Sequence, residues 1–178
     1  MPARPLPLYV FLHECLICKP KIGELRWKVR PLEHFDSAHR QAVWNSKHAG
    51  NIAGSRMPDG YIVVRFGKFL YAAHRIIWYM THGVDPALMI DRKNGNTSDN
   101  RLVNLRPADD TQSARNRRIS SLNTSGFTGV TKQGNRWHAR IKIKGVRFSL
   151  GYFATREEAA AAYAIAARKH FGEYYREN

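Results

Sequence analysis

Residues 136–143 read RWHARIKI, a strict alternation of basic with apolar side chains. Such an alternation is typical of a β-strand that buries one face and exposes the other. The apolar side chains are those of Trp137, Ala139, Ile141 and Ile143. The side chains of the opposite face are those of Arg136, His138, Arg140 and Lys142. This stretch therefore predicts a strand with a core face and a basic face.

Two shorter strands are predicted beside it. The dipeptide Lys-Gly at 144–145 is a two-residue turn signal, after which residues 146–150 repeat the alternation. Their inward side chains are Val146, Phe148 and Leu150, and their outward side chains are Arg147 and Ser149. Residues 127–131 supply a third strand. Together these segments predict a three-stranded antiparallel sheet.

A helix is predicted directly after the sheet. Thr155 can cap the free amides at its start and Glu158 completes a capping box, while Gly172 ends the helix. Its apolar residues recur at spacings of three and four, and they are Ala159, Ala160, Tyr163, Ala166, Ala167 and Phe171. The helix then covers the apolar face of the sheet and leaves the basic face to solvent or to a partner.

The basic face fits a groove of phosphates and base edges in double-stranded DNA. The whole chain has a net charge of +15, with 9 basic and 5 acidic residues in 1–60, 10 and 5 in 61–118, and 10 and 4 in 119–178. Folded surfaces rather than a basic tail must therefore carry the charge, and a polyanion is the expected partner. A hydrated face that only confers solubility is the alternative.

Other features limit the class of protein. No run of about 18 apolar residues is present, so a membrane span is not expected. Residues 6–17 are interrupted by polar residues and lack a cleavage site, which argues against a signal peptide and favours a cytoplasmic protein. Cys15 and Cys18 form a lone C-x-x-C without a second ligand pair, so thiols are favoured over structural zinc.

The rest of the chain carries weaker signals. Residues 24–29 predict a strand and 31–54 a loop. The central elements are a hairpin at 61–66 and 69–73, a helix at 74–82, a strand at 88–91, a polar loop at 92–98 and short helices at 99–105 and 111–118. The predicted organisation is an N-terminal region of uncertain structure (1–58), a central module (59–118), a linker (119–126) and the sheet module (127–178).

The motifs SGFTGV, NRWHARI, GVRFSLGYF and REEAAAAYAIAARKHFGEY follow one another in residues 125–178. They resemble the plant ethylene-response-factor (Apetala) DNA-binding domain, which also occurs fused to phage and bacterial nucleases. The resemblance implies that the sheet enters the major groove. The positions that match DNA-facing ones are Thr128, Thr131, Arg136, Arg140, Lys142, Arg147 and Ser149. Thr128, Thr131 and Ser149 replace two arginines and a tryptophan of that family, so its base preference is not transferred.

The motifs DGYIVVRF, AHRIIWYMTHG, IDRKNGNTSDNRLVNLR and TQSARNRR lie in residues 59–118. They resemble the His-Asn-His (HNH) nucleases of homing-endonuclease type, and residues 23–31 are similar to a segment that precedes such domains. The resemblance implies that the protein is located in a bacterial cell or in a phage-infected host cell. It also implies an α+β chain, in which a ββα-metal-like HNH module is followed by a three-stranded antiparallel sheet packed on one helix. A divalent metal, Mg²⁺ or Mn²⁺, is the cofactor if the module is active.

The resemblance gives Asp91 the role of metal ligand and Asn104 the role of the asparagine that holds the loop. Arg92 stands where the family has its histidine base, and Ser113 where it has a second metal ligand. A guanidinium stays protonated, cannot accept a proton, and competes with a metal ion beside Asp91. Since loss of a positioned base alone costs about 10²–10⁴-fold in rate, efficient cleavage is not expected.

Substitutes for the missing groups stay open. His74 or His82 would serve as the base, and Asn116, one helical turn beyond Ser113, would complete the metal site. Two functions follow: a metal-dependent DNA-nicking enzyme with a degenerate site, or a catalytically inactive DNA-binding protein that regulates or competes for sites. RNA binding is less favoured because Trp137 and Phe148 are predicted to point into the core, which leaves no stacking platform. The sequence does not reveal the recognised DNA or the oligomeric state.

Overall fold

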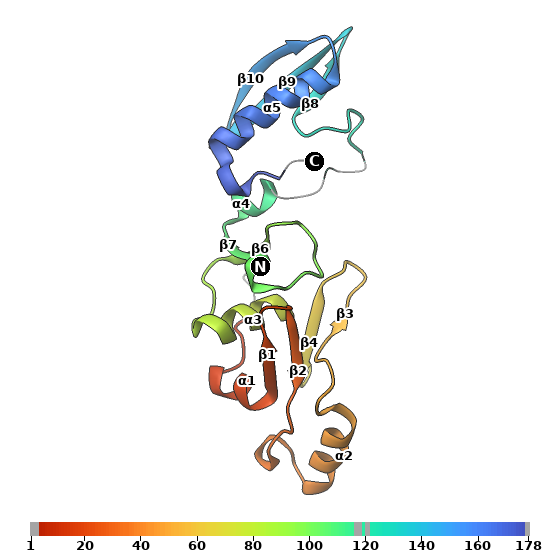
Figure 1. Ribbon diagram of the computed structural model, residues 1–178, viewed down its shortest axis with the longest axis vertical. Coiled ribbons are helices and arrows are strands. Elements are labelled where there is room, and N and C mark those ends of the chain that lie inside the picture. Colours follow the sequence, from red (N-terminus) through yellow and green to blue (C-terminus); the bar gives the residue numbers. More distant parts are fainter. Residues whose placement is uncertain (1–3, 116–118, 120–121, 177–178) are drawn as a thin grey trace. The chain divides into compact units, whose positions relative to one another are not determined.

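A computed structural model describes residues 4–115, 119 and 122–176 of the protein (Figure 1). The chain divides into two compact units, Met1–Ala108 and Asp109–Asn178. Both units combine helices with small antiparallel sheets, in agreement with the predicted α+β class. No helix within the described ranges is long and apolar enough to cross a membrane.

The first unit contains three small antiparallel sheets, β1-β2, β3-β4-β5 and β6-β7. Its elements in chain order are α1 (Tyr9–Cys15), β1 (Leu16–Lys19), β2 (Glu24–Trp27), η1 (Leu32–His34), α2 (Ala38–His48), β3 (Ser55–Arg56), β4 (Ile62–Phe66), β5 (Phe69–Ala72), α3 (Ala73–His82), β6 (Met89–Arg92), η2 (Leu102–Asn104) and β7 (Leu105–Ala108). The predicted hairpin at 61–73 and the helix that follows it are confirmed by β4, β5 and α3.

One hydrophobic cluster holds the first unit together. Ile76 and Ile77 of α3 are fully buried in it, among residues that include Leu16 of β1, Val64 of β4 and Leu105 of β7. Helix α3 is amphipathic, and the β1-β2 hairpin as well as β4 is needed to cover its apolar stripe. The N-terminal residues therefore share a core with the central ones.

Helix α2 lies in the segment 31–54, where the sequence predicts a loop, so that prediction is wrong. Ser37 caps the helix by accepting a hydrogen bond from the amide of Arg40 (3.3 Å). None of the residues of α2 is buried, and Trp44 anchors it edge-on against Trp27 at 5.1 Å between ring centroids. A helix without a buried stripe gives no periodic hydrophobic signal, which explains the error.

The prediction of a short helix at 99–105 is also wrong. Residues Leu102–Asn104 form a single 3₁₀ turn, and Leu105–Ala108 then pair antiparallel with β6. Strand β7 buries Leu105, the last residue of the predicted helix, together with Ala108. Pairing with β6 therefore decides the conformation of this segment.

The second unit is the predicted sheet and helix. Its elements are α4 (Asp110–Arg115), β8 (Val130–Gln133), β9 (Arg136–Ile143), β10 (Val146–Phe153), α5 (Arg156–Phe171) and η3 (Gly172–Tyr174). The sheet has the order β10-β9-β8 and is antiparallel throughout. Ala159, Ala167 and Phe171 of α5 pack with Ala139 and Ile141 of β9, and the predicted capping box of α5 is present. The first strand starts three residues later than predicted.

The β9-β10 hairpin is longer than the sequence predicts. Lys144 and Gly145 have φ of +46° and +86°, as a type I′ turn requires. The register shifts between Ser149 and Gly151, where Gly151 has φ of +121°, and β10 then continues to Phe153. This β-bulge adds one residue to the strand. As a result Tyr152 lies opposite His138.

Candidate functional site

We call the side of the β8-β9-β10 sheet that α5 does not cover the outer face. Directly opposed residues of antiparallel strands share a face, so the register defines its members. They are Thr131, Gln133, Arg136, His138, Arg140, Lys142, Arg147, Ser149 and Tyr152. None of these residues is acidic. Of the side chains predicted to face DNA, only Thr128 lies outside these strands, in the turn before β8.

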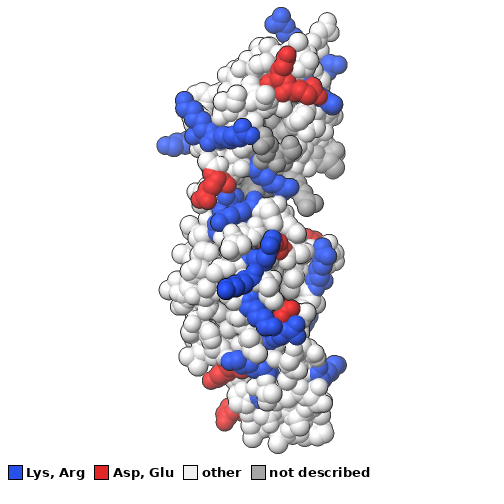
Figure 2. Space-filling view, viewed as in Figure 1, with Lys and Arg blue, Asp and Glu red and all other residues white. Residues whose placement is uncertain are grey.

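Three of the four Lys and Arg side chains of the outer face lie toward the β9-β10 turn, and the fourth, Arg136, lies at the other end of β9. Lys142 and Arg147 are exposed and lie directly opposite each other, and Arg140 of the adjacent pair donates to the hydroxyl of Thr131 (3.4 Å). Figure 2 shows Lys and Arg side chains spread over the visible surface of both units, with fewer Asp and Glu side chains. The outer face therefore has the charge that a polyanion would match.

His138 differs from the solvent-facing side chain that alternation predicts. It is only 7% exposed, because its ring stacks on that of Tyr152 with 4.2 Å between centroids and an angle of 12° between planes. Its Nε2 lies 2.8 Å from the hydroxyl of Ser149. His138 thus contacts two neighbours on the same face rather than solvent.

Two apolar side chains beside the β9-β10 turn are more exposed than predicted. Val146 is 56% and Phe148 47% exposed, although their partners Ile143 and Ile141 belong to the side that α5 covers. Tyr152, in contrast, is 52% exposed on the outer face. The sequence predicts no aromatic stacking platform on the sheet, whereas Tyr152 places an exposed ring there.

In the first unit, Asp91 forms an ion pair across the β6-β7 ladder. Its Oδ2 accepts hydrogen bonds from Nε and Nη2 of Arg106, at 3.1 Å and 3.0 Å. The two residues are direct cross-strand partners, and their side chains are only 12% and 5% exposed. The carboxylate of Asp91 is thus held by a buried cation.

Arg92, the next residue of β6, is 4% exposed. Its Nη2 lies 2.7 Å from Nδ1 of His74 and 3.2 Å from Oδ1 of Asn100, and its guanidinium lies 4.5 Å from the ring centroid of Tyr61. Burial lowers the pKa of the Arg92 guanidinium. These contacts leave the side chain inside the unit, so it does not offer its charge to a phosphate on the surface.

Arg92 fixes the protonation of His74. A guanidinium can only donate, so Nδ1 of His74 must be the acceptor and the ring proton resides on Nε2. Burial, and then the charges of Arg92 and Arg75, lower the pKa of His74 well below its usual value. His74 is therefore a neutral side chain whose Nδ1 lone pair is already used.

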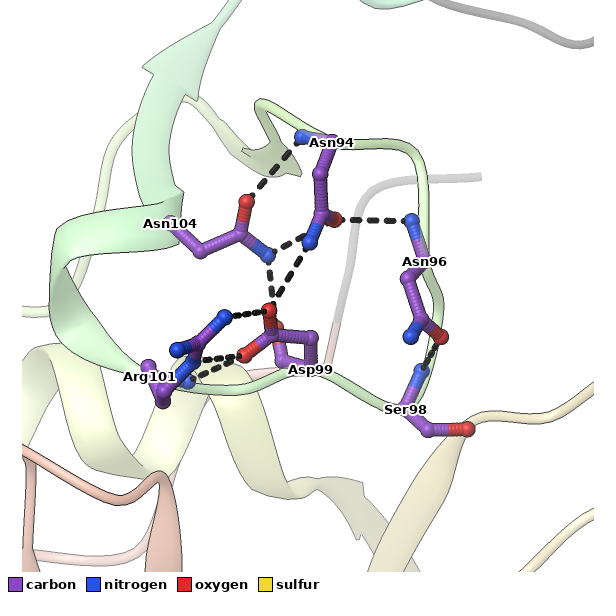
Figure 3. Close-up of polar contacts among 6 residues, drawn as sticks. All are labelled: Asn94, Asn96, Ser98, Asp99, Arg101 and Asn104. Atoms are coloured by element: carbon purple, nitrogen blue, oxygen red, sulfur yellow. Dashed lines mark hydrogen bonds and ion pairs between the residues drawn. The ribbon is translucent and has the colours of Figure 1, made fainter.

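Asn104 holds the loop between β6 and η2 (Figure 3). Its Nδ2 donates to Oδ1 of Asn94 (3.0 Å) and to the carbonyl of Asp99 (2.9 Å), and its Oδ1 accepts from the amide of Asn94 (3.0 Å). The carboxylate of Asp99 binds Nε and Nη2 of Arg101 at 2.9 Å and 2.7 Å. These hydrogen bonds lower the pKa of Asp99 to about 2.

Neighbouring segments fix the same loop from outside. The hydroxyl of Ser98 donates to the carbonyl of Gly60 (2.9 Å), and the amide of Leu102 donates to the carbonyl of Pro20 (2.9 Å). At Gly23, with φ of +72°, a Cβ atom would lie 2.5 Å from the amide nitrogen of Arg101. The loop is therefore packed against the β1-β2 turn and the turn before β4.

Comparison with known proteins addresses this same region. Residues 71–115 match the family model of an HNH endonuclease. The match includes β6, the Asn104-held loop and α4, and it supports an HNH-type domain and a nuclease or DNA-binding function. Neither the curated proteins nor the solved structures contain a match to the chain.

HNH nucleases commonly use divalent metals, but the described surroundings of Asp91 do not favour one. The carboxylate of Asp91 is already bound by Arg106, and the adjacent residue is a second arginine. Among the described residues, no three His, Cys, Asp or Glu side chains are grouped as metal ligands would be. Both hydrogen bonds from Arg106 go to Oδ2 of Asp91, so a dication at this carboxylate would lie beside a buried guanidinium whose charge opposes it.

The remaining predicted site residues lie apart from this cluster or beyond the described ranges. Ser113 is in α4 of the second unit, so a joint site with Asp91 stays a prediction, and Asn116 lies outside the described residues. His82 ends α3, where its ring stacks on Trp78 at 3.9 Å between centroids. Cys15 is buried with its Sγ 3.6 Å from Nδ1 of His34, and burial raises its pKa to about 11.

Sequence reasoning missed three residues that define these sites. Arg106 contacts Asp91, Asn100 contacts Arg92, and Tyr152 belongs to the outer face. A signal for Arg106 was its position between Leu105 and Ala108, which marks a side chain in a buried setting. The contacts of Asn100 had no local signal.

We expect His74 to make the first unit sensitive to mild acid. The pKa of His74 is lowered in the folded state, so below about pH 6.5 the unfolded chain binds the extra proton and stability falls as pH falls. The slope approaches about 1.4 kcal/mol per pH unit. Urea unfolding followed between about pH 8 and about pH 5 measures it. In His74→Gln, whose amide oxygen can still accept from Arg92, the slope should be smaller; equal slopes would contradict this assignment.

Proposed function

We propose that the protein binds double-stranded DNA through the outer face of the second unit. We also propose that the first unit, which contains residues 71–108 of the HNH match and is called the HNH-type unit below, holds DNA without cutting it. The opposition of Lys142 and Arg147 carries the proposal. Like charges directly opposite on neighbouring strands destabilise a sheet. An anionic partner removes this repulsion, and a row of phosphates is such a partner.

The form of the outer face supports a duplex rather than a single strand. Strands lie about 4.8 Å apart, and a two-stranded ribbon fits the major groove, which is about 12 Å wide. The strands that carry Arg136, Arg140, Lys142 and Arg147 are such a ribbon, with β8 at their side. The resemblance of residues 125–178 to the ethylene-response-factor domain supports the same mode of binding.

The contacts of the HNH-type unit support a site of homing-endonuclease type that has lost its chemistry. Arg92 cannot take a proton from water, and it already occupies Nδ1 of His74. Asp91 is neutralised by Arg106. Each of these contacts removes one group that metal-dependent hydrolysis requires.

A plasmid assay tests the loss of cleavage. Supercoiled DNA incubated with the full chain and Mg²⁺ or Mn²⁺ should remain supercoiled. The control variant is Asp91→Asn, which keeps an oxygen acceptor for Arg106 and should give the same result. Metal-dependent nicking that Asp91→Asn abolishes would establish an enzyme and overturn this part of the proposal. A matched binding assay with duplex DNA, single-stranded DNA and RNA tests the partner, and preference for a single strand would overturn the duplex assignment.

We expect Arg147→Ala to lower duplex affinity on the order of ten- to a hundredfold, because a hydrogen bond to a charged group contributes about 1.5–3 kcal/mol. The slope of log affinity against log salt should fall by about 0.9 per lost phosphate contact. Lys132→Ala is the matched control, because it removes a cation from β8 whose cross-strand partner, Trp137, belongs to the covered side. Fluorescence anisotropy with a labelled duplex at several salt concentrations measures both. Equal losses in the two variants would contradict a specific role of the outer face.

A further inference from the structure

We propose that Tyr152 is a base-reading residue of the outer face, and that His138 is the positioning residue which holds its ring. This inference rests on the proposed binding of double-stranded DNA. The observation behind it is the β-bulge at Gly151. Without the bulge Tyr152 would follow Leu150 onto the side that α5 covers; with it, the phenol ring lies opposite His138 and is 52% exposed.

Two parts of the outer face differ in chemistry. Toward the β9-β10 turn it presents Arg140, Lys142 and Arg147, which suit phosphates. The row across its middle contains no lysine or arginine and consists of Thr131, His138 and Tyr152. Phosphate contacts fix position without carrying sequence information, whereas sequence is read by hydrogen bonds and apolar contacts to base edges, which a hydroxyl and a ring edge can make. The exposed ring in this row is therefore placed to read bases.

Tyr152 is held in one orientation. Its ring stacks on His138 at 4.2 Å and 12°, and Nε2 of His138 lies 2.8 Å from the hydroxyl of Ser149. A ring already fixed before binding loses less entropy when it meets its ligand. No hydrogen bond joins the Tyr152 hydroxyl to another of the described residues, so both the hydroxyl and the outer ring edge are available to a base pair.

The imidazole beneath this ring is costly to keep for packing alone. Nδ1 of His138 is buried and has no hydrogen-bond partner among the described residues. A buried unsatisfied group costs about 1–3 kcal/mol, which an apolar side chain at this position would avoid. The support that this flat, anchored ring gives to Tyr152 explains why an imidazole rather than an apolar side chain stands at position 138.

Selection from randomised DNA duplexes tests the proposal with the full chain. The wild type should enrich a motif, and Tyr152→Ala and Tyr152→Leu should lose the preference at one or two adjacent base pairs while the salt slope is unchanged. Arg147→Ala should instead weaken all sequences alike and keep the motif. His138→Ala should alter the same base pairs as Tyr152→Ala, and His138→Phe, which keeps a ring under Tyr152, should restore them.

The outcomes separate this inference from the proposed function. A motif that is unchanged in both Tyr152 variants overturns the reading role, as does a wild type that binds duplexes without any preference; in both cases binding by the outer face stands. A wild type that binds no duplex overturns the proposed function itself. Protection of β9 amides from hydrogen exchange in each variant establishes that the sheet is folded.

Discussion

Gly129→Ala is expected to unfold the second unit while the first remains folded. Gly129 has φ of +73°, and a Cβ atom there would lie 2.3 Å from two ring atoms of Tyr163 on α5 and 2.5 Å from the carbonyl oxygen of Arg140 on β9. The left-handed backbone costs an alanine about 1–2 kcal/mol, and overpacking typically costs a further 1–3 kcal/mol. A loss of about 3 kcal/mol or more is a large share of the stability of a small unit.

Gly126→Ala is the matched control for this prediction. Gly126 has φ of +77°, but a Cβ atom there would meet nothing within 4 Å. Gly126→Ala should therefore lose only the stability that the left-handed backbone conformation costs an alanine. Hydrogen exchange measured by mass spectrometry in the full chain distinguishes β9 peptides from α3 peptides. Equal protection of β9 in both variants would show that the close approach to α5 is not essential.

The same glycine connects folding to the outer face. Its carbonyl accepts a hydrogen bond from the amide of Arg140 at 2.8 Å. A shift of the Gly129 backbone therefore moves the strand that presents Arg140 and His138. We expect DNA affinity of Gly129→Ala to fall with β9 protection, whereas Arg147→Ala should lower affinity without changing protection.

The architecture of the second unit was predictable because its signals are local. The alternation in 136–143, the Lys-Gly turn and the capping box each depend on residues close in sequence, and all three are present in the structure. The bulge was not predicted, because alternation counted through Leu150 places Tyr152 on the apolar side. Gly151 is the residue that marked the irregularity, since a glycine inside a strand often signals a bulge.

The first unit was less predictable because its contacts are distant in sequence. The resemblance directs attention to Asp91, Arg92 and Asn104, and the structure shows that each is engaged. The partners of these residues follow from strand pairing and from the packing of α3, which periodicity does not encode. The error at 99–105 had the same origin, because pairing of β7 with β6 is what brings Arg106 opposite Asp91.

Asp91→Ala is expected to destabilise the first unit by about 3–5 kcal/mol, the typical cost of removing one partner of a buried ion pair. The change takes away the carboxylate that accepts from Nε and Nη2 of Arg106, whose side chain is 5% exposed. Asp36→Ala is the control in the same unit, because the Asp36–Arg40 pair is largely exposed and such pairs contribute about 0.3–0.5 kcal/mol. Urea unfolding measures the difference in stability between the two variants. Hydrogen exchange of the α3 amides is the probe that reports on the first unit.

Metal addition distinguishes a structural Asp91 from a ligand. A dication that bound only the folded state would raise stability by RT ln(1 + [L]/Kd), and Asp91→Ala would lose that increment. Because Arg106 already holds the carboxylate, we expect equal stability of the wild type in EDTA and in excess Mg²⁺. Asp91→Ala combined with Arg106→Met should recover part of the loss, because Arg106 no longer stays buried without its carboxylate, although the buried Arg92 still loses the charge of Asp91. Stabilisation by Mg²⁺ that depends on Asp91 would instead identify a working metal site and reopen the case for cleavage.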